Sequence, residues 1–105
     1  MLDEMDAMVL AGVAKYSDLA EPREWTHYLY VADEAAARSL AIVVADAGWE
    51  IETVYEKPDG NDWVVVAEQR GVVLDKARVR KARTFFERAV SHFEGGNYDG
   101  WETTV

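Results

Sequence analysis

The sequence has 105 residues, half of them apolar, with 20 acidic and 11 basic side chains that give a net charge of −9 at neutral pH. This length accommodates one domain, over residues 1–105, with a single two-layer core. The absence of cysteine excludes disulfides, thiolate metal ligands and cysteine nucleophiles, and the acidic balance disfavours nucleic acid and anionic membranes as partners.

No stretch reaches the roughly 20 apolar residues that a membrane-spanning helix needs. The chain opens on MLDEMDAM, which is acidic where a secretory signal is basic. We therefore expect a cytoplasmic protein without membrane association.

The first predicted element is an N-terminal helix over residues 1–16. Its apolar side chains recur at helical spacing, at Leu2, Met5, Val9, Val13 and Tyr16. This stripe has two candidate partners, the protein's own sheet or a second copy of the chain. The chain is accordingly predicted to be a monomer or a weak homodimer.

A strand and a helix follow the loop that contains Pro22. Residues 24–32, EWTHYLYVA, are rich in aromatic and β-branched side chains, which predicts a strand covered on both faces. Asp33 is a good N-cap for the next helix and Gly48 supplies its C-terminal stop. The apolar stripe of this helix consists of Ala36, Leu40, Val43, Val44 and Ala47.

A β-hairpin is predicted next. Residues 49–56 alternate in polarity, which places one set of side chains on each face of a strand. The apolar set is Trp49, Ile51 and Tyr55, and the acidic set is Glu50, Glu52 and Glu56. The turn KPDGND leads to the returning strand over residues 63–69, and Gly71 is a candidate bulge position.

The last helix is predicted from the Asp75 cap to about Glu94, where Gly95 and Gly96 end it. Six basic residues and one acidic residue crowd residues 76–88. A short tail could supply a fourth strand. The order of elements favours an α+β, ferredoxin-like two-layer sandwich over residues 24–105, with an antiparallel sheet, two helices on one face and the additional N-terminal helix.

The chemistry of an enzyme is not indicated. The two histidines, His27 and His92, are far apart and do not have the spacing of a zinc site. No nucleophile-elbow serine or glycine-rich phosphate loop occurs. We predict no catalytic residues, no metal and no cofactor.

Direct nucleic-acid binding is also not predicted. Tyr28 and Tyr30 lie where RNA-recognition domains stack bases, but residues 63–69 lack the aromatic, glycine-containing pattern of such domains. Instead, charged side chains of the hairpin and the last helix form a candidate protein-interaction surface. They are Glu50, Glu52, Glu56, Arg80 and Arg83.

The tail NYDGWETTV carries two large aromatics beyond the last helix. Asp99 and Gly100 form a tight-turn dipeptide, which would fold the tail back so that Tyr98 and Trp101 pack under the helix or along the sheet edge. We therefore expect Trp101 to be largely buried. Packing is favoured over ligand contact for these four residues.

The same tail, following such a helix, resembles the ending of the RraB family, the regulators of ribonuclease activity B. HYLYVADEAAARSLAIVVADAGWEIE is similar to the strand–helix–strand core of that family, and the likeness extends over about residues 24–104. The resemblance implies a small acidic, bacterial, non-catalytic protein that binds a ribonuclease E-type endoribonuclease and inhibits RNA degradation. The alternative is a generic protein–protein interaction module, self-associating through the N-terminal helix, with no ribonuclease partner.

Overall fold

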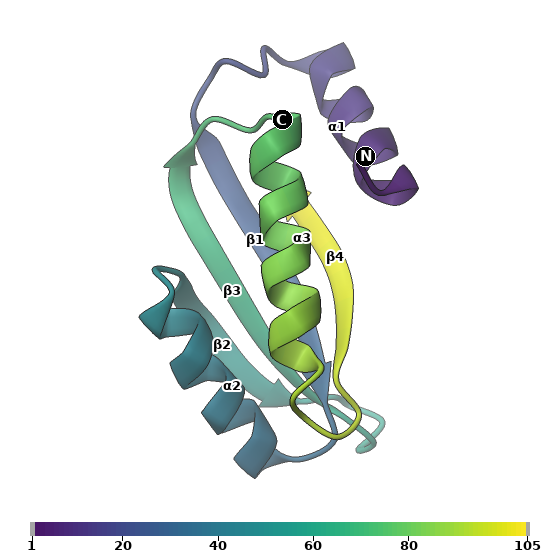
Figure 1. Cartoon of the computed structure of the whole chain (residues 1–105), viewed down its shortest axis with the longest axis vertical. Helices are drawn as coiled ribbons and strands as arrows, with labels where there is room; N and C mark the ends of the chain where they lie inside the picture. Colours follow the sequence, from purple (N-terminus) through teal and green to yellow (C-terminus); the bar gives the residue numbers. More distant parts are fainter. Residues whose placement is uncertain (1, 105) are drawn as a thin grey trace.

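Three helices and a four-stranded antiparallel sheet make up the chain, so its class is α+β, as predicted (Figure 1). The computed structural model describes residues 2–104, and Met1 and Val105, the ends of the predicted domain, lie outside the described residues. The helices are α1 (Glu4–Tyr16), α2 (Glu34–Asp46) and α3 (Lys76–Val90). The strands are β1 (Arg23–Val31), β2 (Glu50–Glu56), β3 (Trp63–Val72) and β4 (Asn97–Thr103).

The strands lie in the order β2-β3-β1-β4, and each neighbouring pair is antiparallel. Helices α2 and α3 pack on one face of this sheet, and α1 lies beside α3 and β4 (Figure 1). The opposite face, called the open face below, is covered by no helix of residues 2–104 (Figure 1).

Each helix begins at an aspartate cap. The side chains of Asp3, Asp33 and Asp75 accept hydrogen bonds from backbone N–H groups of the first turn. These bonds satisfy donors that have no partner within the helix. The predicted helix starts at Asp33 and Asp75 are therefore confirmed. The predicted stop at Gly48 has a positive φ of 100°, which favours glycine.

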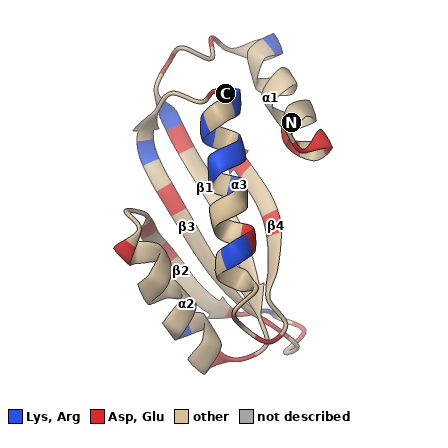
Figure 2. Ribbon diagram, in the orientation of Figure 1, with Lys and Arg blue, Asp and Glu red and all other residues tan. Residues whose placement is uncertain are grey.

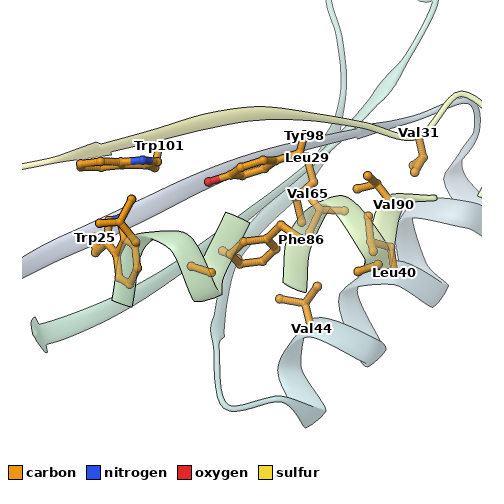
Figure 3. Close-up of a cluster of buried hydrophobic side chains, with 14 of the residues drawn as sticks. Trp25, Leu29, Val31, Leu40, Val44, Val65, Phe86, Val90, Tyr98 and Trp101 are labelled. Carbon is orange, nitrogen blue, oxygen red and sulfur yellow. The ribbon is translucent and has the colours of Figure 1, made fainter. Parts of the chain in front are cut away.

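The core lies between the sheet and its two covering helices. Strand β1 buries alternate side chains toward them, at Trp25, His27, Leu29 and Val31. Phe86 of α3 and Leu40 of α2 complete the layer, as Figure 3 shows. The prediction that β1 is covered on both faces was wrong, because its other side faces away from the helices.

The predicted apolar stripe of α1 was partly wrong. Met5 and Tyr16 are 63% and 73% exposed, whereas Asp6, Leu10 and Val13 are buried. The helix is rotated from the phase that hydrophobicity alone predicts, because its inward side includes a carboxylate with fixed partners.

The predicted stripe of α2 was also partly wrong. The helix buries Ala37, Leu40 and Val44, and leaves Val43 and Ala47 exposed. Small residues occur on more than one side of this helix, so the spacing of its apolar residues did not show which side is buried.

In β2 a register shift between Ile51 and Thr53 breaks the predicted alternation. Because of this bulge, Tyr55 is on the open face rather than beside Ile51. Strand β3 has the expected irregularity at Gly71, whose φ is +67°.

Helix α3 ends at Val90, four residues before the predicted end. Tight turns follow, in which Phe93 N–H donates to the Val90 carbonyl and Gly96 N–H to that of Phe93. The chain thus reverses directly into β4.

Candidate functional site

The C-terminal motif, residues 98–101, places two aromatic side chains on the same face of β4. Residues three apart in a regular strand point to opposite faces, yet Tyr98 and Trp101 both point into the core (Figure 3). The pairing of β4 with β1 shifts register between them, and Gly100 has a φ of 88°. Asp99 and Gly100 therefore form a bulge within a fourth strand, and the predicted turn that folds the tail back was wrong.

Trp101 is buried, as predicted, with 9% of its surface exposed. Its ring stands nearly perpendicular to that of Trp25, with the centroids 6.1 Å apart. Its Nε1–H donates to Oδ1 of Asp6 in α1, at 2.9 Å. The motif thus ties the last strand to the first helix.

Asp6 is the centre of a buried polar cluster. The side chain of Arg83 donates to this carboxylate from Nε at 2.6 Å and from Nη2 at 2.8 Å, and this hydrogen bonding raises the pKa of Arg83. The guanidinium also lies 4.8 Å from the centre of the Tyr98 ring. Asp6, Arg83, Tyr98 and Trp101 therefore hold α1, α3 and β4 together.

The cluster continues to His27, which is fully buried. Its Nδ1 lies 2.6 Å from the Tyr98 hydroxyl, in a hydrogen bond. Burial, and secondarily the charge of Arg83, lowers the pKa of His27 to about 3, so the ring is neutral at physiological pH. An imidazole enclosed in this way among Trp25, Trp49 and Phe86 has no access to a substrate and serves packing.

The fold and motif together agree with one protein family. The model of the family described as RraB: Regulator of ribonuclease activity B matches residues 3–103. The chain belongs to the RraB family. No curated protein matches this sequence. The family is a regulatory one, which suggests a non-enzyme with a protein partner in RNA degradation.

Residues 2–104 of this RraB chain contain no group of three or more His, Asp or Glu side chains that could hold a metal ion. None of the helices in that range has the length and apolar character that a membrane crossing requires.

The structure separates the candidate interaction residues of the sequence. Glu50 pairs with Glu68 on the open face. Glu52 lies in the bulge, and its charge helps to raise the pKa of Tyr28 on the same face. Glu56 pairs with Trp63 on the helix-facing side. Arg80 and Arg83 belong to α3, which packs on the helix-covered face of the sheet (Figure 1).

The open face of the RraB chain is aromatic at its centre. Tyr28 pairs with Val66, and Val64 lies between Tyr30 and Tyr55. The two valines are only 4% and 1% exposed although no helix of the described chain covers them. The neighbouring tyrosines therefore shield the valines and themselves form the surface.

Two of these tyrosines are fixed by carboxylates of β4. The Tyr28 hydroxyl donates to Glu102, and the Tyr30 hydroxyl donates to Oδ2 of Asp99 at 3.1 Å. The bond to Glu102 is the main cause that raises the pKa of Tyr28 to about 12, and burial first and then Asp99 raise that of Tyr30. Both phenols therefore remain protonated donors at neutral pH.

Sequence reasoning missed the role of Asp6. It is one of three acids at the start of α1, and nothing local distinguishes it from its exposed neighbours. The shielded valines of β3 were missed for a similar reason, since a continuous apolar run in a strand usually indicates burial under helices on both faces.

Proposed function

We propose that this chain is a non-catalytic regulator that binds and inhibits a ribonuclease E-type endoribonuclease, and so modulates RNA degradation. The observation that carries this proposal is the RraB family match over residues 3–103. The net charge of −9 supports a basic protein segment as the contact, because complementary charge accelerates association.

The same proposal includes the setting in which the protein acts. The strand order β2-β3-β1-β4 with α2 and α3 on one face supports a ferredoxin-like description of the fold. We place the protein in the cytoplasm, where RNA is degraded, with no direct RNA contact and no membrane contact.

Inhibition is tested with the purified ribonuclease E-type endoribonuclease of the same organism. Cleavage of a fluorescent single-stranded RNA is followed with increasing amounts of this protein, together with gel-shift measurements of the RNA alone. We expect cleavage to slow in a saturable manner without any shift of the RNA. Unchanged cleavage at saturating protein, or protection caused by binding to the RNA itself, would contradict the proposal.

One feature favours the second candidate, an interaction module that self-associates through α1. Met5, Met8 and Tyr16 are exposed by 63%, 63% and 73%, and methionines adapt well to a partner surface. Sedimentation equilibrium over a wide concentration range tests it. A dimer that Met5→Gln/Met8→Gln abolishes would support self-association, and a monomer at every concentration would refute it.

A further inference from the structure

We propose that the open face of the sheet is the docking surface for an arginine-rich segment of the protein partner. The inference rests on the proposed function for the identity of the partner, and on the geometry of the sheet for the location. The motif residues Tyr98 and Trp101 are buried, so the family motif itself does not show where the partner binds.

The centre of this face has the character of a protein-binding surface. Tyr28, Tyr30 and Tyr55 lie around Val64 and Val66, and Tyr55 is 41% exposed. Tyrosine is enriched at interfaces because its ring offers a large apolar area and its hydroxyl a polar contact. The hydroxyl bonds to Glu102 and Asp99 restrict two of these rings, which reduces the entropy lost when a partner binds.

The surroundings of this aromatic centre are acidic. The carboxylates on the face, or bonded to its tyrosines, are Glu24, Glu50, Glu52, Glu68, Asp99 and Glu102. Three of them already share Arg70, at 2.9 Å from Glu68, 3.7 Å from Glu24 and 3.8 Å from Glu50. Within residues 2–104, Glu52 and Glu102 take part in no ion pair, so negative charge remains beside Tyr28.

The chain itself shows that a cation fits over this surface. Lys57 Nζ lies 5.0 Å from the centre of the Tyr30 ring, which is within the range of a cation–π interaction. Tyr28 and Tyr55 have no such cation within the described chain. An arginine of the partner could stack on Tyr28 and donate to Glu52 and Glu102, because a carboxylate that accepts one hydroxyl has further lone pairs.

Arginine fits this combination better than lysine or RNA. The planar guanidinium stacks on an aromatic ring and donates two parallel hydrogen bonds to a carboxylate. Phosphates would be repelled by the carboxylates. The basic cluster of residues 76–88 lies within α3, on the helix-covered side of the sheet (Figure 2), so it does not neutralise the open face.

The test compares two charge-matched double variants. Glu52→Gln/Glu102→Gln removes two carboxylates from the open face, and Glu34→Gln/Glu94→Gln removes two exposed carboxylates elsewhere. Both variants have the same net charge, so a general electrostatic effect weakens both equally. The probe is a fluorescein-labelled arginine-rich peptide, read by anisotropy, with a lysine-for-arginine peptide beside it.

We expect the open-face variant to bind the arginine peptide about tenfold more weakly, the equivalent of one lost stacked ion pair. The control variant should change affinity by about twofold or less, and the lysine peptide should bind the wild-type protein more weakly. In NMR spectra of the wild-type protein, peptide-induced shifts should centre on Tyr28, Thr53 and Val66. Equal losses in both variants, shifts centred on α1 or α3, or tighter binding of a single-stranded RNA would overturn the inference.

The ribonuclease inhibition assay distinguishes a failure of this inference from a failure of the proposed function. If the wild-type protein inhibits the enzyme and the open-face variant inhibits equally well, the docking surface is wrong and the function stands. If the peptide binds the open face as expected but the enzyme is neither bound nor inhibited, the function is wrong and the surface stands.

Discussion

Replacement of Asp6 by alanine tests whether a single buried carboxylate fastens α1 to the rest of the protein. Asp6 is 2% exposed and accepts hydrogen bonds from two side chains, the guanidinium of Arg83 and the indole N–H of Trp101. Alanine would leave the indole N–H without its acceptor, and would leave Arg83 with only its longer ion pairs to Glu87 at 3.5 Å and Asp3 at 3.9 Å. The loss therefore combines one orphaned donor with the loss of the shortest ion pair of Arg83.

The magnitude follows from how well water can replace the carboxylate. Breaking a fully buried ion pair costs about 3 to 5 kcal/mol. The Arg83 side chain is 20% exposed, so water can partly solvate it and the lower end applies. The orphaned indole N–H adds about 1 kcal/mol or more. We expect a loss near 4 kcal/mol, which is a large share of the roughly 5 to 15 kcal/mol of a small domain.

Urea denaturation at neutral pH measures this loss, and hydrogen exchange locates it. The midpoint should fall without a large change of slope, and the amides of α1 should exchange faster than those of β1 and β3. Glu4→Ala, an exposed acid of the same first turn, is the control and should cost about 0.5 kcal/mol. A loss below about 1 kcal/mol for Asp6→Ala would refute the reasoning.

Three other substitutions test the core. Trp101→Phe removes the indole N–H, and its cost should shrink by about 1 kcal/mol in an Asp6→Ala background, measured as a double-mutant cycle. His27 is neutral when folded because its pKa is lowered to about 3 from 6.5. The unfolded chain therefore gains a proton first, and this part of the stability, complete above pH 6.5, declines by about 1.4 kcal/mol per unit from pH 6.5 down to 3. His27→Phe should remove that slope from urea titrations, and His92→Gln should retain it. Gly96→Ala should cost at least about 2 kcal/mol in thermal melts, because its Cβ would lie 1.9 Å from the Val90 carbonyl oxygen.

Those parts of the fold that depend on neighbouring residues were predictable from the sequence. Asp33 and Asp75 cap helices because a short acidic side chain reaches the first-turn N–H groups wherever the helix later packs. Gly71, the predicted bulge position, has a positive φ of 67° that other residues rarely adopt. Such signals need no knowledge of the tertiary structure.

Features that depend on distant residues were not predictable in the same way. The phase of α1 is set by Asp6, whose partners are 77 and 95 residues away in the sequence. The predicted apolar stripe did not include Asp6, because no local signal indicates that a guanidinium and an indole will donate to it in the folded protein. The bulge at Glu52 similarly reversed the predicted faces of Tyr55 and Glu56, since alternation assumes an unbroken register.

The bulge in β4 directs side chains of the same motif to both faces of the sheet. Residues that stabilise the fold and residues proposed to contact the partner therefore lie on opposite sides of one strand. The bulge turns Tyr98 and Trp101 toward the helices, where they pack and bond to His27 and Asp6. It also places Asp99 beside Tyr30 on the open face, where the partner is proposed to dock. Variants on the inward side should therefore reduce partner binding only as far as they reduce the folded fraction. Variants at the exposed carboxylates of the outward side, Glu52 and Glu102, should reduce binding at an unchanged melting temperature, because these side chains carry little of the core.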